Sequence, residues 1–560
     1  MDDNAASQDN PTGQDLAPYE GRWVALAGGQ VAGVGDTAMA AERLGRRNRL
    51  RERLSVYFVE ADGGSPLALP DQLQELRPLF RSHDQPVHLV GGAVRDVLLG
   101  REVEDLDFVV PSGAIRLAFK VADILNTPAY VLDRERDTGR VILPDGETTL
   151  DFACYRGTDL RDDLQSRDFT INAMALPVEA RRQTSLVDPC AGQSDLKARL
   201  IRLTHPLAIE EDPVRAMRAV RHAIDLGFEI EGSTREAIRK SSDQLNDVSV
   251  ERIRDELLKM LCASAPESAI RALSALDLLA AVLPEVATLS STPQTPPHFE
   301  FAFAHTLSVM ANLARLERLI AADQPPGEIR LAEAYEILEA HKTLLSEHLE
   351  RRLDGGVSGS QILQLAALLH DVGKAKTMTV EANGRIRFFG HAEYGAELAA
   401  NRLTSMHLSR EAVRQVKHIV GGHMRPLLLA QTRKVSRRAV YRFFRDTEGA
   451  GLDITLLALA DQLALARSGK STPQWHRLLE VVAQLHRHYF AHYDEMIKPA
   501  ALLDGRDVME ILGINPGPKV GWFLGQLVEA QAAGEVATKD EAVNLVINLA
   551  ANDGELTTGQ

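Results

Sequence analysis

The spacing of hydrophobic and polar residues changes along the chain, and these changes predict its elements. Between residues 86 and 205, short apolar runs of strand length alternate with helical periods. From about residue 206 onward, Leu, Ile and Ala recur mainly at helical spacing, with a Pro/Ser/Thr-rich hinge at 290–297. The pattern predicts an α+β protein in which a mixed sheet with helices is followed by helical domains.

The stretch His88–Val110 combines two predicted strands with candidate chemistry. Its apolar start turns at Gly91 and Gly92, a short helical period follows, and Asp105 and Asp107 stand just before an apolar end. Because residues two apart on a strand point the same way, both carboxylates are expected to face one side. Paired acids beside a glycine turn can hold a divalent metal and a nucleoside triphosphate.

A third carboxylate, Asp151, lies in a predicted strand at 148–153 among apolar neighbours. An acid in such a place is costly to bury alone, and a metal shared with Asp105 and Asp107 would explain it. The three acids are the predicted catalytic and metal-binding set, with Mg²⁺ as the expected cofactor. Two ions held by them would activate a hydroxyl group and bind a leaving pyrophosphate.

Residues 18–62 show a separate pattern of strand, strand, helix and strand, which predicts a small ββαβ accessory module. It carries no acid pair and no His cluster, so we expect it to mediate contacts. Residues 1–17 predict a disordered tail, and residues 63–85 predict a linker with one short helix.

Composition narrows the class of partner. The 560 residues carry a formal net charge of −15, so any nucleic-acid surface must be a local basic patch. The three cysteines are far apart and form no CxxC pair, which suits a reducing cytosol and argues against a zinc–thiolate site. The sequence has neither a signal-peptide pattern nor an apolar run of membrane-spanning length. A cytoplasmic protein without a membrane partner is therefore predicted.

Four motifs occur in order and resemble those of one family. The first combines GGAVRD at 91–96 with DLD at 105–107, and it is followed by RDFTINA at 167–173, DPCAGQSDL at 188–196 and EDPVR at 211–215. Together they resemble the class II tRNA nucleotidyltransferases and the related bacterial poly(A) polymerases. The resemblance extends from about residue 86 to the C-terminal helices.

The first motifs are expected to bind a nucleotide. The glycine turn can approach phosphates closely because no Cβ intervenes, and Arg95 and Arg156 are candidate cations for the triphosphate. The resemblance implies that Arg167, Asp168 and Asn172 help to hold the ribose and triphosphate. For Arg167 and Asp168, a structural ion pair is the alternative.

The EDPVR motif is expected to select the base. Asp212 and Arg215 are three residues apart, with Arg218 on a similar helical face. An Asp acceptor and an Arg fork can read a base edge, and the resemblance implies that this pair serves as a protein template for CTP and ATP. A salt bridge on a solvated helix is the alternative.

Ser166 stands where the family often has another Arg, so one cation is missing there. The predicted nucleotide-binding residues are Gly91, Gly92, Arg95, Arg156, Arg167, Asp168, Asn172, Asp212, Arg215 and Arg218.

A second set of chemistry-bearing residues follows in the helical part. His305, the pair His370 and Asp371 in HDVGK, and Asp461 occur in an order that resembles the HD phosphohydrolase domain. Imidazoles and carboxylates suit a divalent transition metal, which can generate hydroxide for phosphoester hydrolysis. The alternative is a degenerate domain that only supports RNA. His391 and His423 are candidates to enlarge the site toward two metals. Gly422 stands where relatives often have a second consecutive His, which argues against that enlargement.

A basic segment without Asp or Glu supplies the candidate RNA surface. Its predicted RNA-binding residues are Arg433, Lys434, Arg437 and Arg438. The interleaved aromatics Tyr441, Phe443 and Phe444 are expected to lie in the core.

With the resemblance, the domains can be named as expectations. Residues 86–205 are the predicted nucleotidyltransferase head, 206–297 a helical neck with the base-reading motif, 298–470 an HD-like domain, 471–551 a C-terminal helical domain and 552–560 a tail.

The resulting hypothesis is a template-independent enzyme that adds CCA, or part of it, to the 3′ end of tRNA from CTP and ATP. The primer 3′-hydroxyl would attack the α-phosphate in line and release pyrophosphate. A poly(A) polymerase or an A-only adding enzyme is the first alternative. An HD phosphohydrolase with a nucleotide-binding N-terminal fold, and a non-catalytic RNA-binding protein, are the others. The nucleotides added, the activity of the HD site, the role of the N-terminal module and the oligomeric state stay open.

Overall fold

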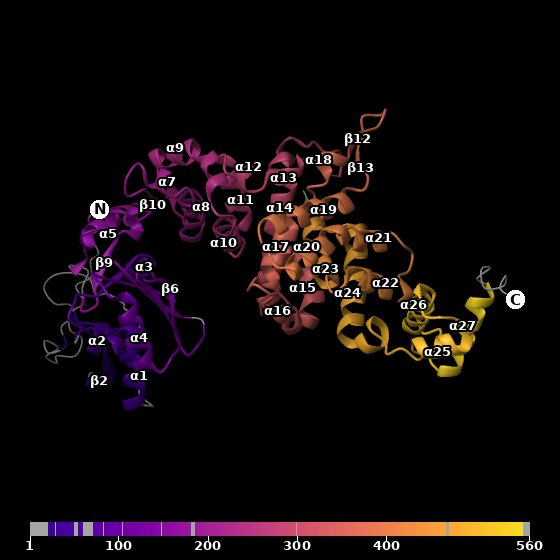
Figure 1. Ribbon diagram of the computed structural model, residues 1–560, viewed down its shortest axis with the longest axis horizontal. Helices are drawn as coiled ribbons and strands as arrows, with labels where there is room; N and C mark the ends of the chain where they lie inside the picture. Colours follow the sequence, from indigo (N-terminus) through magenta and orange to yellow (C-terminus); the bar gives the residue numbers. More distant parts are fainter. Residues whose placement is uncertain are drawn as a thin grey trace. The chain divides into compact units, whose positions relative to one another are not determined.

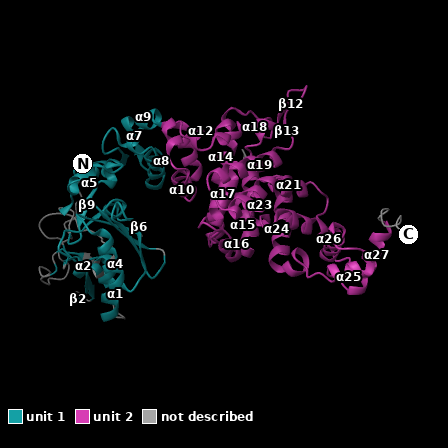
Figure 2. Ribbon diagram, viewed as in Figure 1, with its two compact units in different colours: residues 1–241 teal, residues 242–560 magenta. Residues whose placement is uncertain are grey.

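The computed structural model describes residues 19, 21–27, 30–49, 54–59, 71–81, 83–103, 105–146, 148–180, 185–297, 300–465 and 470–552. The predicted tail at 1–17 lies outside these residues, as does the tail at 552–560 except Asn552. The chain divides into two units, residues 1–241 and 242–560 (Figure 2). The first contains the large mixed sheet and the second is mainly helical, so the α+β class is confirmed. The EDPVR motif belongs to the first unit.

A six-stranded sheet forms the centre of the first unit. Its strand order is β6-β7-β8-β5-β4-β9, and only the central pair β5 and β8 runs parallel. The strands are β4 (His88–Val90), β5 (Leu106–Val110), β6 (Ala129–Asp133), β7 (Thr138–Ile142), β8 (Thr149–Cys154) and β9 (Ala175–Pro177).

Alternation along β5 and β8 separates the core face of the sheet from its polar face. Phe108 and Phe152 are register partners and stack at a centroid distance of 4.9 Å. Phe80 of α2 (Asp71–Arg81) packs against both rings, at 5.2 Å from Phe108 and 6.3 Å from Phe152. The residues that precede these rings, Asp107 and Asp151, therefore point to the opposite face.

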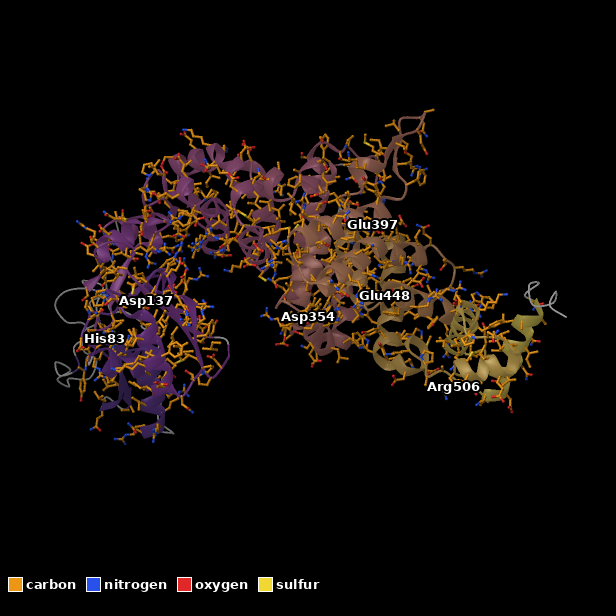
Figure 3. The ribbon with its side chains drawn as sticks, in the orientation of Figure 1. His83, Asp137, Asp354, Glu397, Glu448 and Arg506 are labelled. Atoms are coloured by element: carbon orange, nitrogen blue, oxygen red, sulfur yellow. The ribbon has the colours of Figure 1, made fainter. Side chains whose placement is uncertain are left out.

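A carboxylate fixes the start of α4 (Ala114–Leu125) beside the sheet. Asp137, labelled in Figure 3, accepts hydrogen bonds from the backbone amides of Gly113, Ala114 and Ile115 at 2.8, 3.1 and 2.9 Å. An acid at a helix N-terminus satisfies donors that have no partner within the helix and complements the helix dipole.

The N-terminal module has the predicted order of elements. Its antiparallel sheet runs β2-β1-β3, and α1 packs against β2 because Gly33 lets the two backbones approach closely. Asp36 accepts from the buried guanidinium of Arg77 in α2 at 2.5 Å, which ties the module to the head. The elements are β1 (Trp23–Ala27), β2 (Gln30–Gly35), α1 (Ala38–Asn48) and β3 (Leu54–Phe58).

Short helices complete the first unit around the motifs. They are α3 (Gly92–Leu99), α5 (Leu160–Gln165), α6 (Gly192–Ala198), α7 (Ala208–Glu211), α8 (Val214–Leu226) and α9 (Gly232–Lys240), with the short parallel pair β10 (Leu200–Ile201) and β11 (Glu229–Ile230).

Two helices that are buried on nearly all sides form the centre of the second unit. Nearly every residue of α17 (Gly359–Leu369) and α23 (Gly451–Ala464) is buried, as expected for helices enclosed by others. Helix α17 begins at Gly359, where Ser358 and Gln361 form a capping box. Against this pair packs α14 (Ala302–Ala321).

The remaining helices of the second unit surround this centre, and the last three have a small core of their own. They are α10 (Val250–Leu261), α11 (Pro266–Ala275), α12 (Leu279–Val282), α13 (Pro284–Ala287), α15 (Ile329–Leu338), α16 (Lys342–Glu350), α18 (Lys374–Thr377), α19 (His391–Ser405), α20 (Arg410–Gly422), α21 (Arg425–Ala430), α22 (Arg437–Thr447), α24 (Pro473–Ala491), α25 (Gly505–Leu512), α26 (Pro518–Ala533) and α27 (Lys539–Asn552). A hairpin of β12 (Met378–Val380) and β13 (Ile386–Phe388) extends from them (Figure 1). Among the described residues, no helix has the length and apolar character needed to cross a bilayer.

Replacing Phe80 tests the layer beneath the acids. We expect Phe80→Ala to lower the unfolding free energy of the sheet by about 3–5 kcal/mol, because it leaves a cavity under Phe108 and Phe152. Hydrogen exchange of the β5 and β8 amides measures this locally. Phe119→Ala on α4 is the matched control, since that ring is 40% exposed. Equal protection in the two variants would contradict the assigned core.

Candidate active site and metal cluster

The parallel register of β5 and β8 brings two of the predicted acids together. Asp107 and Asp151 are Cα partners in this ladder, so their side chains leave the same face of the sheet. Asp105 lies just before β5, and its carboxylate accepts from the Thr149 amide and hydroxyl at 3.2 and 2.8 Å. Desolvation raises the pKa of Asp107 to about 6, against the influence of Arg167, and the charges of Asp151 and Asp105 add to the rise.

Arg140 is a neighbour of these acids that the sequence analysis missed. It stands opposite Asp151 on β7 and donates to both of its carboxylate oxygens at 2.6 Å. Carboxylates on one face of a sheet suit a hard divalent cation, and Asp107 and Asp151, with Asp105 just before β5, are the predicted residues for one here. In this structure, Arg140 supplies part of the compensating positive charge. A basic residue within a short strand carries no motif that could have revealed this role.

The glycine turn lies against Asp107 and Arg167. Gly91 has a φ of 72°, and a Cβ there would lie 3.2 Å from Arg167 Nη1 and 3.3 Å from Asp107 Oδ2. Only glycine adopts this conformation readily and leaves that space open. The structure thus brings the glycine turn, an acid and a predicted phosphate-binding cation to one point.

A buried acid that the motifs did not indicate orients the Arg167 side chain and holds the backbone of Arg156. Asp163 accepts from Arg167 Nε and Nη2 at 3.1 and 3.0 Å, and from the Arg156 amide at 3.0 Å. Burial and then the charge of Arg167 lower the pKa of Arg156. The concentrated positive charge suits an anionic ligand such as a triphosphate.

Asp168 and Asn172 form a connected polar network with two arginines. Arg95 Nη1 donates to Asn172 Oδ1 at 2.8 Å, Asn172 Nδ2 donates to Asp168 Oδ1 at 3.2 Å, and Arg218 Nη1 lies 3.0 Å from Asp168 Oδ2. Burial alone would raise the pKa of Asp168. The charge of Arg218 and further partners outweigh the effect of burial, and the pKa of Asp168 falls to about 2. The structure pairs Arg167 with Asp163 and Asp168 with Arg218, in place of the alternative pairing of Arg167 with Asp168.

The guanidinium of Arg215 is buried and hydrogen-bonded to two backbone carbonyls. Its Nη1 donates to the Ala208 carbonyl at 3.1 Å and its Nη2 to the Ser166 carbonyl at 3.0 Å, while its Nε lies 4.0 Å from Asp212 Oδ2. The alternative of a salt bridge on a solvated helix does not describe this buried side chain. Because Ser166 directly precedes Arg167, the predicted base-reading motif is hydrogen-bonded to the segment that carries the predicted phosphate-binding cation.

The second unit gathers a buried cluster of imidazoles and carboxylates. His305, His370 and Asp461 offer ligand atoms within 4.8 Å of one another, and so do Asp371, His391 and His423. His305 Nε2 lies 2.9 Å from Asp461 Oδ1, and His370 Nε2 lies 3.2 Å from Asp371 Oδ2. All four predicted ligands therefore meet, and His391 and His423 join them.

Backbone carbonyls set the orientation of three of these rings. The Nδ1 atoms of His370, His391 and His423 lie 2.7, 2.8 and 2.7 Å from the carbonyls of Ala367, Phe388 and Val420. An Nδ1–H that donates to a carbonyl leaves Nε2 with a lone pair, and the Nε2 atoms of His391 and His423 lie 3.3 Å apart. Burial lowers the pKa of His423 to about 3, which keeps the ring neutral. Converging neutral imidazoles fit a divalent transition metal.

Close packing against Ile454 explains why a glycine stands at position 422 in this chain. A Cβ there would lie 2.6 Å from Ile454 Cδ1 of α23. A second consecutive His would therefore have to move the end of the Ile454 side chain, and His391 and His423 lie in the cluster without it.

The basic segment is engaged with the C-terminal helices. Arg437 pairs with Glu495 at 2.5 Å and Arg438 with Glu535 at 2.6 Å, while Arg442 and Arg445 reach the buried Glu529. Arg433 and Lys434 are exposed in the turn before α22. Burial of Tyr441, Phe443 and Phe444 in the core is confirmed.

Comparisons with known proteins cover the same regions of the chain. Residues 87–202 match the poly A polymerase head domain, 227–289 the "probable RNA and SrmB- binding site of polymerase A" and 302–466 the HD domain. The chain is similar to solved structures of a CCA-adding enzyme with ATP (TM-score 0.55, 20% identity, 86% of this chain and 95% of that one) and of the Thermotoga maritima CCA-adding enzyme with tRNA (0.51, 21%, 86% and 96%). These likenesses show the shared fold.

Curated relatives are similar over most of their length. An A-adding tRNA nucleotidyltransferase of Deinococcus radiodurans is 35% identical over 81% of this chain and 93% of its own. A CC-adding tRNA nucleotidyltransferase of Thermus thermophilus is 32% identical over 81% of this chain and 91% of its own. With the head motifs assembled around the paired acids, this chain belongs to the family of tRNA nucleotidyltransferases that share the poly(A) polymerase head.

Proposed function

We propose that this protein adds nucleotides to the 3′ end of tRNA, taking CTP, ATP or both and releasing pyrophosphate. The observation that carries the proposal is the parallel register of Asp107 and Asp151 beside the Gly91 turn and Arg167. Relatives named for A addition and CC addition support the substrate class, as do CCA-adding structures solved with ATP and tRNA.

The residues of the head divide the chemistry among them. Asp105, Asp107 and Asp151 would hold Mg²⁺, which when bound supplies charge stabilisation and favours the ionised form of a hydroxyl. Arg167 and Arg156 offset the triphosphate charge where the glycine backbone allows close approach. The primer 3′-oxygen then forms a bond to the α-phosphorus as the bond to the bridging oxygen of pyrophosphate breaks.

Base selection is assigned to Asp212 and Arg215, with Arg218 beside them. Arg215 donates two hydrogen bonds to the carbonyls of Ala208 and Ser166. Because the guanidinium is planar, these bonds set the direction of its remaining N–H donors. A rigid donor next to the Asp212 acceptor distinguishes base edges by hydrogen bonding, without a nucleic-acid template. Because cytosine and adenine edges both pair an amino donor with a ring acceptor, these residues suit CTP and ATP.

The nucleotides added are tested with tRNA primers that end before the CCA, after C, after CC and after CCA, each with one triphosphate at a time. We expect incorporation of C, of A or of both on the incomplete ends, and none on the complete end. Repeated A addition to every primer would instead identify a poly(A) polymerase. Gel resolution of the extended tRNA measures each step.

Substitution of Asp107 tests whether the head is catalytic. We expect Asp107→Asn to reduce nucleotide incorporation by at least about 10²-fold, because it removes one of the carboxylates that would hold Mg²⁺. Asp123→Asn, an exposed acid on α4, is the matched control and should retain full activity. Incorporation at the control rate in Asp107→Asn would leave only a nucleotide-binding role for the head.

A second activity, metal-dependent phosphoester hydrolysis, is favoured by the converging Nε2 atoms of the HD cluster. A transition metal held there would make hydroxide available at neutral pH. Lys374 lies 2.6 Å from Asp371 Oδ2 and offers a cation beside the cluster for a phosphate. Water oxygen would bond to phosphorus as the ester P–O bond breaks, and the leaving oxygen would take the proton of the water.

Substitution of His423 tests the cluster. We expect His423→Ala to lower retained transition metal and phosphoester hydrolysis by about tenfold or more, because one converging ligand is lost. His418→Ala on the same helix is the matched control, since that ring pairs with Glu448 outside the cluster. Elemental analysis of dialysed protein and phosphate release are the measurements. Metal content equal to the control would contradict a metal role for His423.

A further inference from the structure

The β12–β13 hairpin exposes an unusual amount of apolar surface for so short an element. Phe389 is 73% exposed, Val380 64% and Met378 41%. Figure 1 shows the hairpin standing out from the helices of the second unit. Large exposed apolar side chains gathered on one element indicate a contact surface.

This hairpin is joined directly to the metal cluster. The Phe388 carbonyl accepts from Nδ1 of the ligand His391 at 2.8 Å, with only Phe389 and Gly390 between them in sequence. Lys374 Nζ lies 2.6 Å from Asp371 and 5.4 Å from the centre of the Phe388 ring. A molecule resting on the hairpin would therefore lie beside the groups that handle phosphate.

The base of the hairpin is braced by the segment that precedes α14. The Ile386 amide donates to Thr295 Oγ1 at 3.3 Å, and that hydroxyl donates to the Ile386 carbonyl at 3.3 Å. Gln294 Oε1 accepts from Lys374 at 2.7 Å. These bonds anchor one end of the hairpin next to the cluster and leave its side chains exposed to a ligand.

The exposed groups have the chemistry of a nucleobase platform. The Arg387 guanidinium lies 5.9 Å from the centre of the Phe389 ring. Arg387 Nε donates to Glu381 Oε1 at 3.1 Å. An aromatic ring with an adjacent guanidinium offers flat faces on which any base can stack. Arg385 and Lys376 add positive charge nearby, which suits an anionic ligand better than an apolar protein surface.

We propose that the hairpin Met378–Phe389 binds the base of a nucleoside phosphate, free or at an RNA end, and presents its phosphate ester to the HD cluster. Phe389 and Arg387 are the base-binding residues, and Lys374 contacts the phosphate. This inference rests on the proposed hydrolysis at that cluster. It makes the hairpin the element that distinguishes nucleotide esters from other phosphate esters.

The kinetic test uses the full-length protein loaded with Mn²⁺, Co²⁺ or Ni²⁺. Hydrolysis of uridine 3′-monophosphate, of a short RNA with a 3′-phosphate and of p-nitrophenyl phosphate is compared. We expect Phe389→Ala to lower kcat/KM for the nucleotide, relative to p-nitrophenyl phosphate, by about tenfold and mainly through KM. Phe119→Ala, an exposed Phe in the other unit, is the matched control and should leave the ratio unchanged. Preference for the RNA over the mononucleotide would identify an RNA end as the source.

A second readout does not depend on turnover. Ultraviolet crosslinking of 4-thiouridine 3′-monophosphate should label the peptide that contains Phe389, and Phe389→Ala should lose that label. Labelling without hydrolysis by the wild type would reject the hydrolase while keeping the base-binding hairpin. Hydrolysis with an unchanged substrate ratio and no label on the hairpin would overturn this inference. Self-association that disappears in Phe389→Ala, together with an unlabelled hairpin, would assign the surface to a second copy of the chain.

Discussion

The parallel pairing of β5 with β8 is the constraint on which the head depends. It fixes Asp107 opposite Asp151 on one face and Phe108 opposite Phe152 on the other, so one register sets both the reactive surface and the core. A shift by a single residue would exchange these faces and bury the acids. The flanking strands and α2 hold this register, because Phe80 contacts both rings. Chemistry and stability are therefore specified by the same hydrogen bonds.

The backbone framework of the site was predictable because short-range patterns determine it. The glycine turn, the strand of Asp107 and the apolar helix before His370 all follow from spacing within about ten residues. Arg140 and Asp163 were not predictable in this way. Arg140 acquires its role from the strand opposite it, and Asp163 from a helix whose sequence resembles any solvated turn. Such partners are selected by tertiary pairing, which leaves no local signal.

The histidines illustrate the same limit in the second unit. His391 begins α19 and His423 directly follows the end of α20, positions where a surface His is ordinary. Their place in the cluster depends on the carbonyl behind each ring and on the approach of the two helices to each other. Gly422 argued against an enlarged cluster from sequence, yet its packing against Ile454 is compatible with one. The basic segment shows the reverse case, because several of its arginines meet carboxylates that lie nearly a hundred residues away.

The bond from Arg215 to the Ser166 carbonyl has a consequence for fidelity. With Arg215 as the proposed base reader, this bond links base recognition to the placement of Arg167, which directly follows Ser166. A mismatched nucleotide that displaces the base reader would also displace the cation that aligns the leaving group. Discrimination would then be expressed in the rate of the chemical step as well as in occupancy, since misalignment by a fraction of an ångström weakens in-line transfer. Under the proposed function, this hydrogen bond would let the enzyme reject an incorrect nucleotide after it has bound.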